Sequence, residues 1–217
     1  MAWCVLRDVW ARGQEVNVLF GPAATLDSLL VHTALEVRSW LEQSCVQRAH
    51  DAVCAETTTA QARALRRRHA FVIAVPAAYH VVERDGSSAV ELVSAAPTRS
   101  VTVFWRDGAE APESMPGAAL LALQQQSLKR LHGDSLAVDT CRLRVEPTAP
   151  ERLVLRGGWE NRAEVAAGPL VTYFVYDAPR RRLYGVQGQL FAPGQRKRST
   201  QIEIEALMRT FRLETSR

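Results

Sequence analysis

Strand-like segments follow one another in the last third of the chain with no helix between them, and this order limits the fold more than any other feature. Apolar residues dominate or alternate in Leu136 to Val145, Leu153 to Trp159, Leu170 to Tyr176 and Leu183 to Phe191. Successive strands joined by turns pair in antiparallel fashion, whereas regular alternation of strand and helix leads to a parallel sheet. The pattern therefore predicts an α+β fold with an antiparallel or mixed sheet.

The first two thirds of the chain supply shorter strands and most of the helices. Apolar runs predict strands at Glu15 to Phe20, Ala70 to Val75, Tyr79 to Glu83, Val90 to Val93 and Val101 to Arg106. Apolar positions three and four residues apart predict helices at Leu26 to Ala49, with Thr25 as N-cap, at Thr58 to Arg68, at Ala118 to Leu131 and near the C-terminus. Thr200 and Glu203 have the spacing of a capping box for the last helix, and the alternative is that this helix begins one turn earlier. We expect these three to four helices to pack mainly on one face of the sheet, in a single domain over residues 1–217.

Arginine supplies nearly all of the positive charge. The chain carries a formal net charge of +4, and 25 of its 27 basic residues are arginine, because Lys129 and Lys197 are the only lysines. Arginine is suited to binding carboxylates and phosphates, but codon usage in a GC-rich genome explains the same bias. A net charge of +4 is mild for a dedicated nucleic-acid binder, so nucleic acid is not the expected partner.

Three basic triplets are candidates for anion binding: Arg66-Arg67-Arg68, Arg180-Arg181-Arg182 and Arg196-Lys197-Arg198. If they converge on one face of the fold, they form a surface for phosphates or another polyanion. Aromatic residues between them would favour nucleic acid, but only Tyr184 lies close to a triplet in the sequence. The alternative is that each triplet is solvated at the end of a helix or at a turn.

The four cysteines predict neither a disulfide framework nor a metal site. Cys4, Cys45, Cys54 and Cys141 are scattered, and no CxxC pair occurs. On one straight helix, Cys45 and Cys54 lie ~13 Å apart along the axis, which is too far for a disulfide. They can pair only if the helix ends near His50 and the chain turns back. Cys45, His50 and Cys54 could supply three zinc ligands, but zinc requires a fourth, and none is evident. No metal ion is therefore expected.

The sequence carries none of the local motifs that identify common catalytic or cofactor-binding sites. It has no G-x-S-x-G elbow, phosphate-binding P-loop, H-E-x-x-H pair or dinucleotide fingerprint. Glu203 and Glu205 are two residues apart and so diverge on a helix, which argues against a pair of catalytic carboxylates. We therefore assign no catalytic residue and no cofactor, and a non-enzymatic role is favoured.

The most specific segment runs from Arg156 to Arg198. It has an arginine–glycine–x–tryptophan sequence, a glycine–proline pair before a strand, an alanine–proline pair after one, and a lysine–arginine pair before the last helix. These positions are Arg156, Gly157, Trp159, Gly168, Pro169, Ala192, Pro193, Lys197 and Arg198. Through them the chain resembles an uncharacterised family of Bacteroidota envelope lipoproteins that is classed as a domain of unknown function. Weaker similarity extends back to the region of Asp8, Val9 and Trp10.

This resemblance implies a location in the cell envelope, periplasmic or anchored to the outer membrane, and a lipoprotein signal followed by a further N-terminal segment. The first ten residues, MAWCVLRDVW, have neither the basic region nor the apolar stretch of a secretory signal. No run reaches the ~18 apolar residues of a membrane span. We therefore expect either a shortened family member or a start upstream of Met1, and the sequence as written is also compatible with the cytoplasm. The chain further departs from the family at Ala166 and Ala167, where methionine and glycine are expected.

The same segment also has a physical interpretation of its own. Gly157-Gly158 allows a sharp bend or a close backbone approach before Trp159, and Gly168-Pro169 fixes the start of the long hairpin. Pro193 ends the hairpin's second strand. The favoured interpretation is that these residues are parts of a scaffold. The alternative is a ligand groove with Trp159 in its wall, in which the binding residues are Arg156, Lys197 and Arg198, as anchors for an anion.

Three functions follow from these observations. The first is a non-enzymatic module of the cell envelope that binds an unknown partner or supports structure. The second is a small-ligand binder or enzyme with a pocket near Trp159, and the third is an anion or nucleic-acid binder that uses the arginine triplets. If relatives pair another strand beside Glu15 to Phe20, this chain leaves that strand as a bare edge, and we expect self-association through it.

Overall fold

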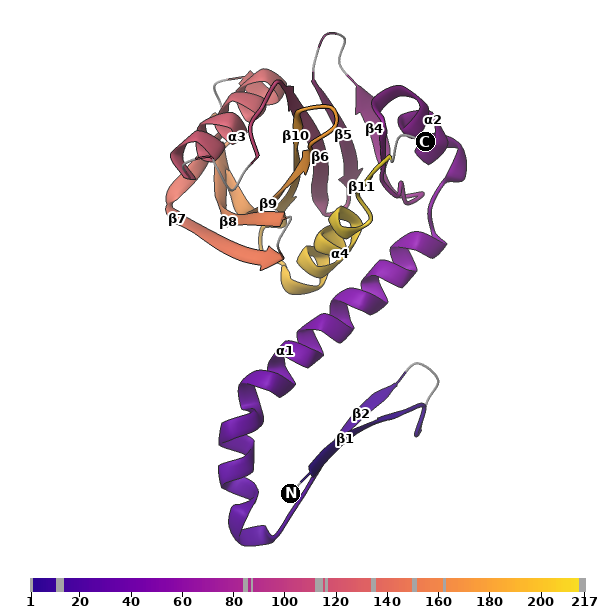
Figure 1. The fold of residues 1–217 in the computed structure, drawn as a ribbon, viewed down its shortest axis with the longest axis vertical. Coiled ribbons are helices and arrows are strands. Elements are labelled where there is room, and N and C mark those ends of the chain that lie inside the picture. Colours follow the sequence, from indigo (N-terminus) through magenta and orange to yellow (C-terminus); the bar gives the residue numbers. More distant parts are fainter. Residues whose placement is uncertain are drawn as a thin grey trace. The chain divides into compact units, whose positions relative to one another are not determined.

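The computed structural model describes residues 2–10, 14–83, 86, 88–111, 115, 117–133, 136–149, 152–161 and 163–214. The chain divides into two compact units, Met1–Cys45 and Val46–Arg217, which are considered one at a time. Figure 1 shows their helices and strands. The expectation of one domain over residues 1–217 stays a prediction.

The first unit contains a two-stranded antiparallel sheet and the first part of a long helix. β1 (Ala2–Arg7) pairs with β2 (Glu15–Phe20), with Ala2 opposite Phe20 and Arg7 opposite Glu15. The strand predicted at Glu15 to Phe20 is confirmed, and β1 is a partner that the sequence did not indicate.

The helix α1 (Ala23–Ala55) is longer than predicted at both ends. It begins directly after Pro22, at two alanines with high helix propensity, so the predicted N-cap at Thr25 is wrong. At the other end it runs unbroken past His50, and the turn that a Cys45–Cys54 disulfide requires does not form. The two cysteines therefore lie nine residues apart on one helix, too far apart to be bridged.

The second unit is built on seven antiparallel strands in the spatial order β4-β5-β6-β10-β9-β8-β7. Two meanders, β4-β5-β6 and β7-β8-β9-β10, are joined where β6 pairs with β10 along its whole length. The strands are β4 (His80–Glu83), β5 (Ala89–Ala95), β6 (Thr98–Asp107), β7 (Leu136–Ala149), β8 (Arg152–Asn161), β9 (Ala166–Asp177) and β10 (Arg182–Phe191). The predicted α+β class is confirmed, and of the two sheet types left open the antiparallel one is found.

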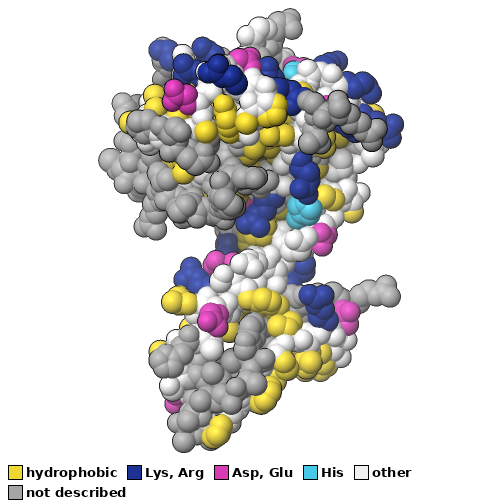
Figure 2. All heavy atoms as spheres, viewed as in Figure 1, with side chains coloured by type: hydrophobic (Ala, Val, Ile, Leu, Met, Phe, Trp, Pro, Cys, Tyr) yellow, Lys and Arg dark blue, Asp and Glu magenta, His cyan; other side chains and the backbone are white. Residues whose placement is uncertain are grey.

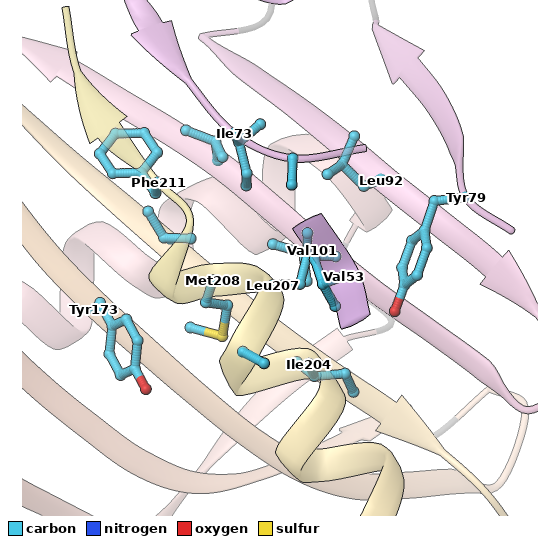
Figure 3. Packing of buried hydrophobic residues seen from close by; sticks show 14 of the residues in the cluster. Val53, Ile73, Tyr79, Leu92, Val101, Tyr173, Ile204, Leu207, Met208 and Phe211 are labelled. Atoms are coloured by element: carbon cyan, nitrogen blue, oxygen red, sulfur yellow. The ribbon is translucent and has the colours of Figure 1, made fainter. Parts of the chain in front are cut away.

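One face of the sheet is covered mainly by α4 (Arg198–Arg209), with α2 (Thr59–His69) and the end of α1 beside it. Figure 3 shows Ile204, Leu207 and Met208 of α4 among the other buried side chains of this cluster, which include Val101 of β6 and Tyr173 of β9. The three α4 residues are at most 2% exposed. A short sheet of β3 (Phe71–Val72) and β11 (Arg212–Leu213) lies at the end of this core.

The opposite face is covered by α3 (Gly117–His132), which carries the chain from β6 to the far edge strand β7. Phe104 and Phe174 point to this face because they alternate with residues that pack against α4. Leu120 and Leu123 of α3 pack on them. The helices therefore lie mainly, but not only, on one face.

One local prediction needs correction. The strand predicted at Ala70 to Val75 is reduced to Phe71–Val72, because Ala70 has a left-handed backbone (φ 55°) and residues 73–75 are buried outside any ladder. Thr200 lies inside α4, whose N-cap position is Lys197, so of the two starts left open for the last helix the earlier one is found. The turn predicted around Asp85-Gly86-Ser87 lies partly outside the described residues.

Candidate functional site

A pocket of about 120 Å³ lies between α4 and the sheet, where β8, β9 and β10 run side by side. Its floor includes Gly157, Gly188 and Pro169, and Gln201 and Glu205 of α4 form part of its wall. Gly188 is needed there, because a Cβ at this position would lie 2.3 Å from Ile204 Cγ2. The β9–β10 ladder ends at Leu170 opposite Gln189, next to Pro169, which has no N–H to continue it. Residues without long side chains thus leave the hollow open.

Arg156 and Glu205 close one side of this pocket. Arg156 Nη1 and Nη2 donate to Glu205 Oε1 and Oε2 at 2.6 and 2.9 Å, a bidentate, charge-assisted arrangement. The Tyr173 hydroxyl donates to Glu205 Oε2 at 3.2 Å. Burial, reinforced by the negative charge of Glu205, raises the pKa of Tyr173, so this hydroxyl stays protonated and can donate.

A second set of the same three residue types holds the other side of α4. Arg99 Nη2 lies 2.9 Å from Glu203 Oε1, and Arg99 Nε donates to the Tyr79 hydroxyl at 3.0 Å. Burial, followed by the charge of Glu203, raises the pKa of Tyr79 to about 12. Glu203 and Glu205 diverge as predicted, and each fastens α4 to a different meander of the sheet.

Trp159 does not line this pocket. It is 8% exposed and lies on the α3 side of the sheet with Leu128 and Leu170, its ring centroid 6.2 Å from that of Phe191. Its neighbour across the strands is Gly168, where a Cβ would lie 2.9 Å from Trp159 Nε1. The groove that the alternative interpretation placed between Trp159 and Arg156 is therefore not formed, because the two side chains lie on opposite faces of β8.

The remaining candidate residues are spread over three places. Gly157 and Pro169 line the pocket, and β8 passes through Gly157-Gly158 without a break, so the close approach and not the sharp bend is found. Lys197 and Arg198 are exposed at the start of α4, one turn before Gln201. Pro193 lines a second, open pocket of about 480 Å³ beside Pro97.

Two of the three basic triplets meet. Arg66 Nε lies 2.7 Å from Glu214 Oε1, and Arg180 Nη1 donates to the Glu214 carbonyl at 3.2 Å. Arg182 Nε lies 2.5 Å from Asp107 Oδ1, and its guanidinium covers the Trp105 ring. Figure 2 shows Lys and Arg side chains gathered along the upper rim of this unit.

The third triplet lies at the other end of β10. Arg182, the first residue of β10, pairs with Asp107, whereas the last, Phe191, pairs with Thr98 at the opposite end of β6. Lys197 follows Phe191 closely in the chain. The three triplets therefore do not form one surface.

Sequence reasoning missed Gln201, Glu205 and Tyr173 as parts of the site. One signal was available: an arginine inside a strand of a covered sheet needs a carboxylate partner. Which carboxylate meets Arg156 is decided by how α4 docks, 49 residues further along the chain, and no local pattern indicates this.

Within the part of the chain that the structure describes, no three His, Cys, Asp or Glu side chains are arranged to hold a metal ion. No described helix combines the length and hydropathy needed to cross a membrane.

The fold and the pocket define an antiparallel α+β unit with a small, partly polar cavity under its last helix. The chain belongs to the family described as a domain of unknown function, DUF4837, whose profile matches residues 58–210. The matched range covers α2 to α4 and all seven strands of the large sheet.

Solved structures that are similar to this chain include the following two. The Saccharomyces cerevisiae Ran-binding protein Mog1p has 9% sequence identity and a TM-score of 0.44, over 67% of this chain and 90% of that chain. A mutant of protein Mog1 has 9% identity and a TM-score of 0.43, over 68% of this chain and 92% of that chain. Among curated proteins, none matches the chain in sequence. These similarities concern the fold and say nothing about function.

Proposed function

We propose that the protein is a non-enzymatic binding module of the cell envelope, and that a small ligand or side chain enters the pocket under α4. One observation carries the proposal: Arg156 and Glu205 are the titratable side chains among the pocket's lining residues, and they are bonded to each other. A paired arginine and carboxylate can orient a ligand through their remaining lone pairs and N–H groups. Neither is poised as a free general base or nucleophile.

The test blocks the pocket from the α4 side. Gln201→Trp places a large ring at the pocket wall, and Gln61→Trp on the exposed side of α2 is the matched control. Thermal shift of the purified chain is measured with a panel of amino acids, sugars, fatty acids and peptidoglycan fragments. We expect at least one class to raise the Tm of the wild type and the control but not of Gln201→Trp. A panel without effect, or chemical conversion of the bound compound, would contradict the proposal.

The envelope location rests on the resemblance of the Arg156–Arg198 segment alone. It is tested by fractionating the native cells and detecting the protein by mass spectrometry. Recovery with the envelope fraction, on a chain with a lipidated cysteine upstream of Met1, supports it. Recovery in the cytosol, with a peptide that begins at Met1, contradicts it.

A second function is anion binding at the place where the two triplets meet. It is favoured by the link that Glu214 makes between Arg66 and Arg180, which brings together basic residues more than 100 positions apart. Arg67 and Arg181 are exposed there. Heparin retention of the chain should fall in Arg67→Glu with Arg181→Glu and stay unchanged in Arg130→Glu on α3. Equal retention of all three proteins would exclude this site.

A further inference from the structure

A row of polar side chains crosses the sheet beneath α3. Glu91 of β5 is opposite Thr102 of β6, Thr102 is opposite Gln187 of β10, and Gln187 is opposite Thr172 of β9. The four residues therefore lie side by side on four neighbouring strands. Gln124 of α3 lies over the row and donates to Thr172 Oγ1 and, at 3.1 Å, to Gln187 Oε1. The other face of the same strands is apolar.

This polar row is buried and incompletely hydrogen-bonded. Thr102, Gln124 and Gln187 are each at most 1% exposed. Among the described residues, Thr102 Oγ1, Gln124 Oε1, Gln187 Nε2 and Gln189 Nε2 have no hydrogen-bond partner. Buried polar groups without partners are rare in proteins because each forfeits its hydration. Exchanging the amide oxygen and nitrogen of Gln124 and Gln187 does not help, since one atom of each amide still lacks a partner.

The unpartnered atoms define the chemistry of what would satisfy them. Gln187 Nε2 and Gln189 Nε2 are donors, Gln124 Oε1 is an acceptor, and the Thr102 hydroxyl can act as either. None of them carries a charge, so a charged molecule would pay a large desolvation cost in this place. At one end the row borders Glu91, a buried residue, and His132: His132 Nε2 lies 3.8 Å from Glu91 Oε1, and the two side chains are 23% and 10% exposed.

We propose that the polar row is a binding site for a small neutral molecule that both donates and accepts hydrogen bonds. Retained water and a small organic solute with amide or hydroxyl groups share this chemistry. Either occupant would bridge Thr102, Gln187 and Gln124, and would thereby connect β6, β10 and α3. The site lies on the opposite face of the sheet from the pocket under α4 and does not depend on the function proposed for that pocket.

The test uses the full chain and separates the two occupants. Magnetic relaxation dispersion of the solvent water detects long-lived internal water, and native mass spectrometry followed by denaturation detects a retained organic solute. We expect the wild type to hold at least one such molecule. Thr102→Val and Gln187→Leu should each lose it, whereas Thr102→Ser, which keeps the hydroxyl, should retain it. Thr59→Val and Gln61→Leu on α2 are matched exposed controls and should change nothing.

Two results would overturn the proposal. The first is a wild type with neither long-lived water nor a bound solute. The second is a rise in the Tm of Thr102→Val with an unchanged occupant, because removing a hydroxyl that has no partner stabilises a core, whereas removing one that binds an occupant does not. If Gln187→Leu does not fold, the measurements on the wild type and on Thr102→Val are sufficient to test the proposal.

Discussion

Arg156 on β8 and Glu205 on α4 form two parallel hydrogen bonds, with N–O distances of 2.6 and 2.9 Å. This pair connects the last helix to the meander β7-β8-β9-β10, and Arg99 and Glu203 connect it to the meander β4-β5-β6. Both arginines lie at the edges of an apolar interface, where a guanidinium keeps contact with water while its donors are directed at a carboxylate. The arrangement fixes α4 in position over the glycine-lined pocket.

Loss of the Arg156–Glu205 pair should destabilise the fold. The side chains are 36% and 18% exposed, so we expect Arg156→Met to lower the free energy of unfolding by about 1–3 kcal/mol. A double-mutant cycle with Glu205→Gln, followed by urea denaturation, should give a coupling energy of about 0.5–3 kcal/mol. Arg63→Met on exposed α2 is the control and should change little. Strictly additive effects would show that the pair contributes no coupling.

Alkaline pH should weaken the fold through Tyr79. Its pKa is raised in the folded protein from 10.0 to about 12, so between these values the unfolded chain has lost a proton that the folded chain still holds. The contribution of Tyr79 to the free energy of unfolding is therefore fully present below pH 10. It falls by up to about 1.4 kcal/mol per pH unit as the pH rises towards 12. Urea unfolding of Tyr79→Phe across this range should show a slope with pH that is smaller by this amount. Identical slopes would contradict the raised pKa.

Gly185 should not tolerate a methyl group. A Cβ at this position of β10 would lie 2.1 Å from Phe104 Cζ on the neighbouring strand. We expect Gly185→Ala to cost about 1–3 kcal/mol through overpacking, and Phe104→Leu in the same chain to recover part of that loss. Gly117→Ala, at the open start of α3, should be neutral or slightly stabilising. Equal unfolding midpoints for the two alanine variants would refute this interpretation.

The first unit should drive self-association. Seven of the nine large apolar side chains exposed in the described residues lie in it, and Val31 and Leu35 of α1 are 75% and 78% exposed. Its two-stranded sheet also has an unpaired side on each strand among the described residues. Sedimentation velocity should show oligomers at high concentration that are lost in Val31→Glu with Leu35→Glu. Val165→Glu, at an exposed position of the second unit, should leave them intact. A strictly monomeric wild type would exclude this surface.

Local patterns predicted most elements of the fold and failed where tertiary packing decides. The strand at Glu15 to Phe20 and the long hairpin were predicted because alternation and turn residues act over a few positions. The strand predicted at Ala70 to Val75 was too long, because a buried irregular segment is as apolar as a buried strand. Thr25 has the chemistry of an N-cap, but α1 begins two residues earlier, at two alanines with high helix propensity, and α4 takes the earlier of the two starts left open for it.

The residues that the sequence singled out are divided between the two faces of the sheet. Arg156, Gly157 and Pro169 line the pocket, whereas Trp159 lies on the α3 face. The alternation of side chains along a strand is enough to predict this result. Residues 156 and 159 are three positions apart, so their side chains must point to opposite faces of one strand. The partner Glu205 could not be found in this way, because its contact with Arg156 depends on long-range docking of a helix.

The pairing of β6 with β10 has a consequence for synthesis of the chain. β6 ends at Asp107, and the strand that covers its free edge begins only at Arg182. While the ribosome adds the intervening residues, the β4-β5-β6 hairpins carry an open, apolar margin with no strand to close it, and such margins attract other chains. The free edge of β6 is therefore covered only late in synthesis, and a ribosome-associated chaperone that shields this edge should raise the yield of folded protein.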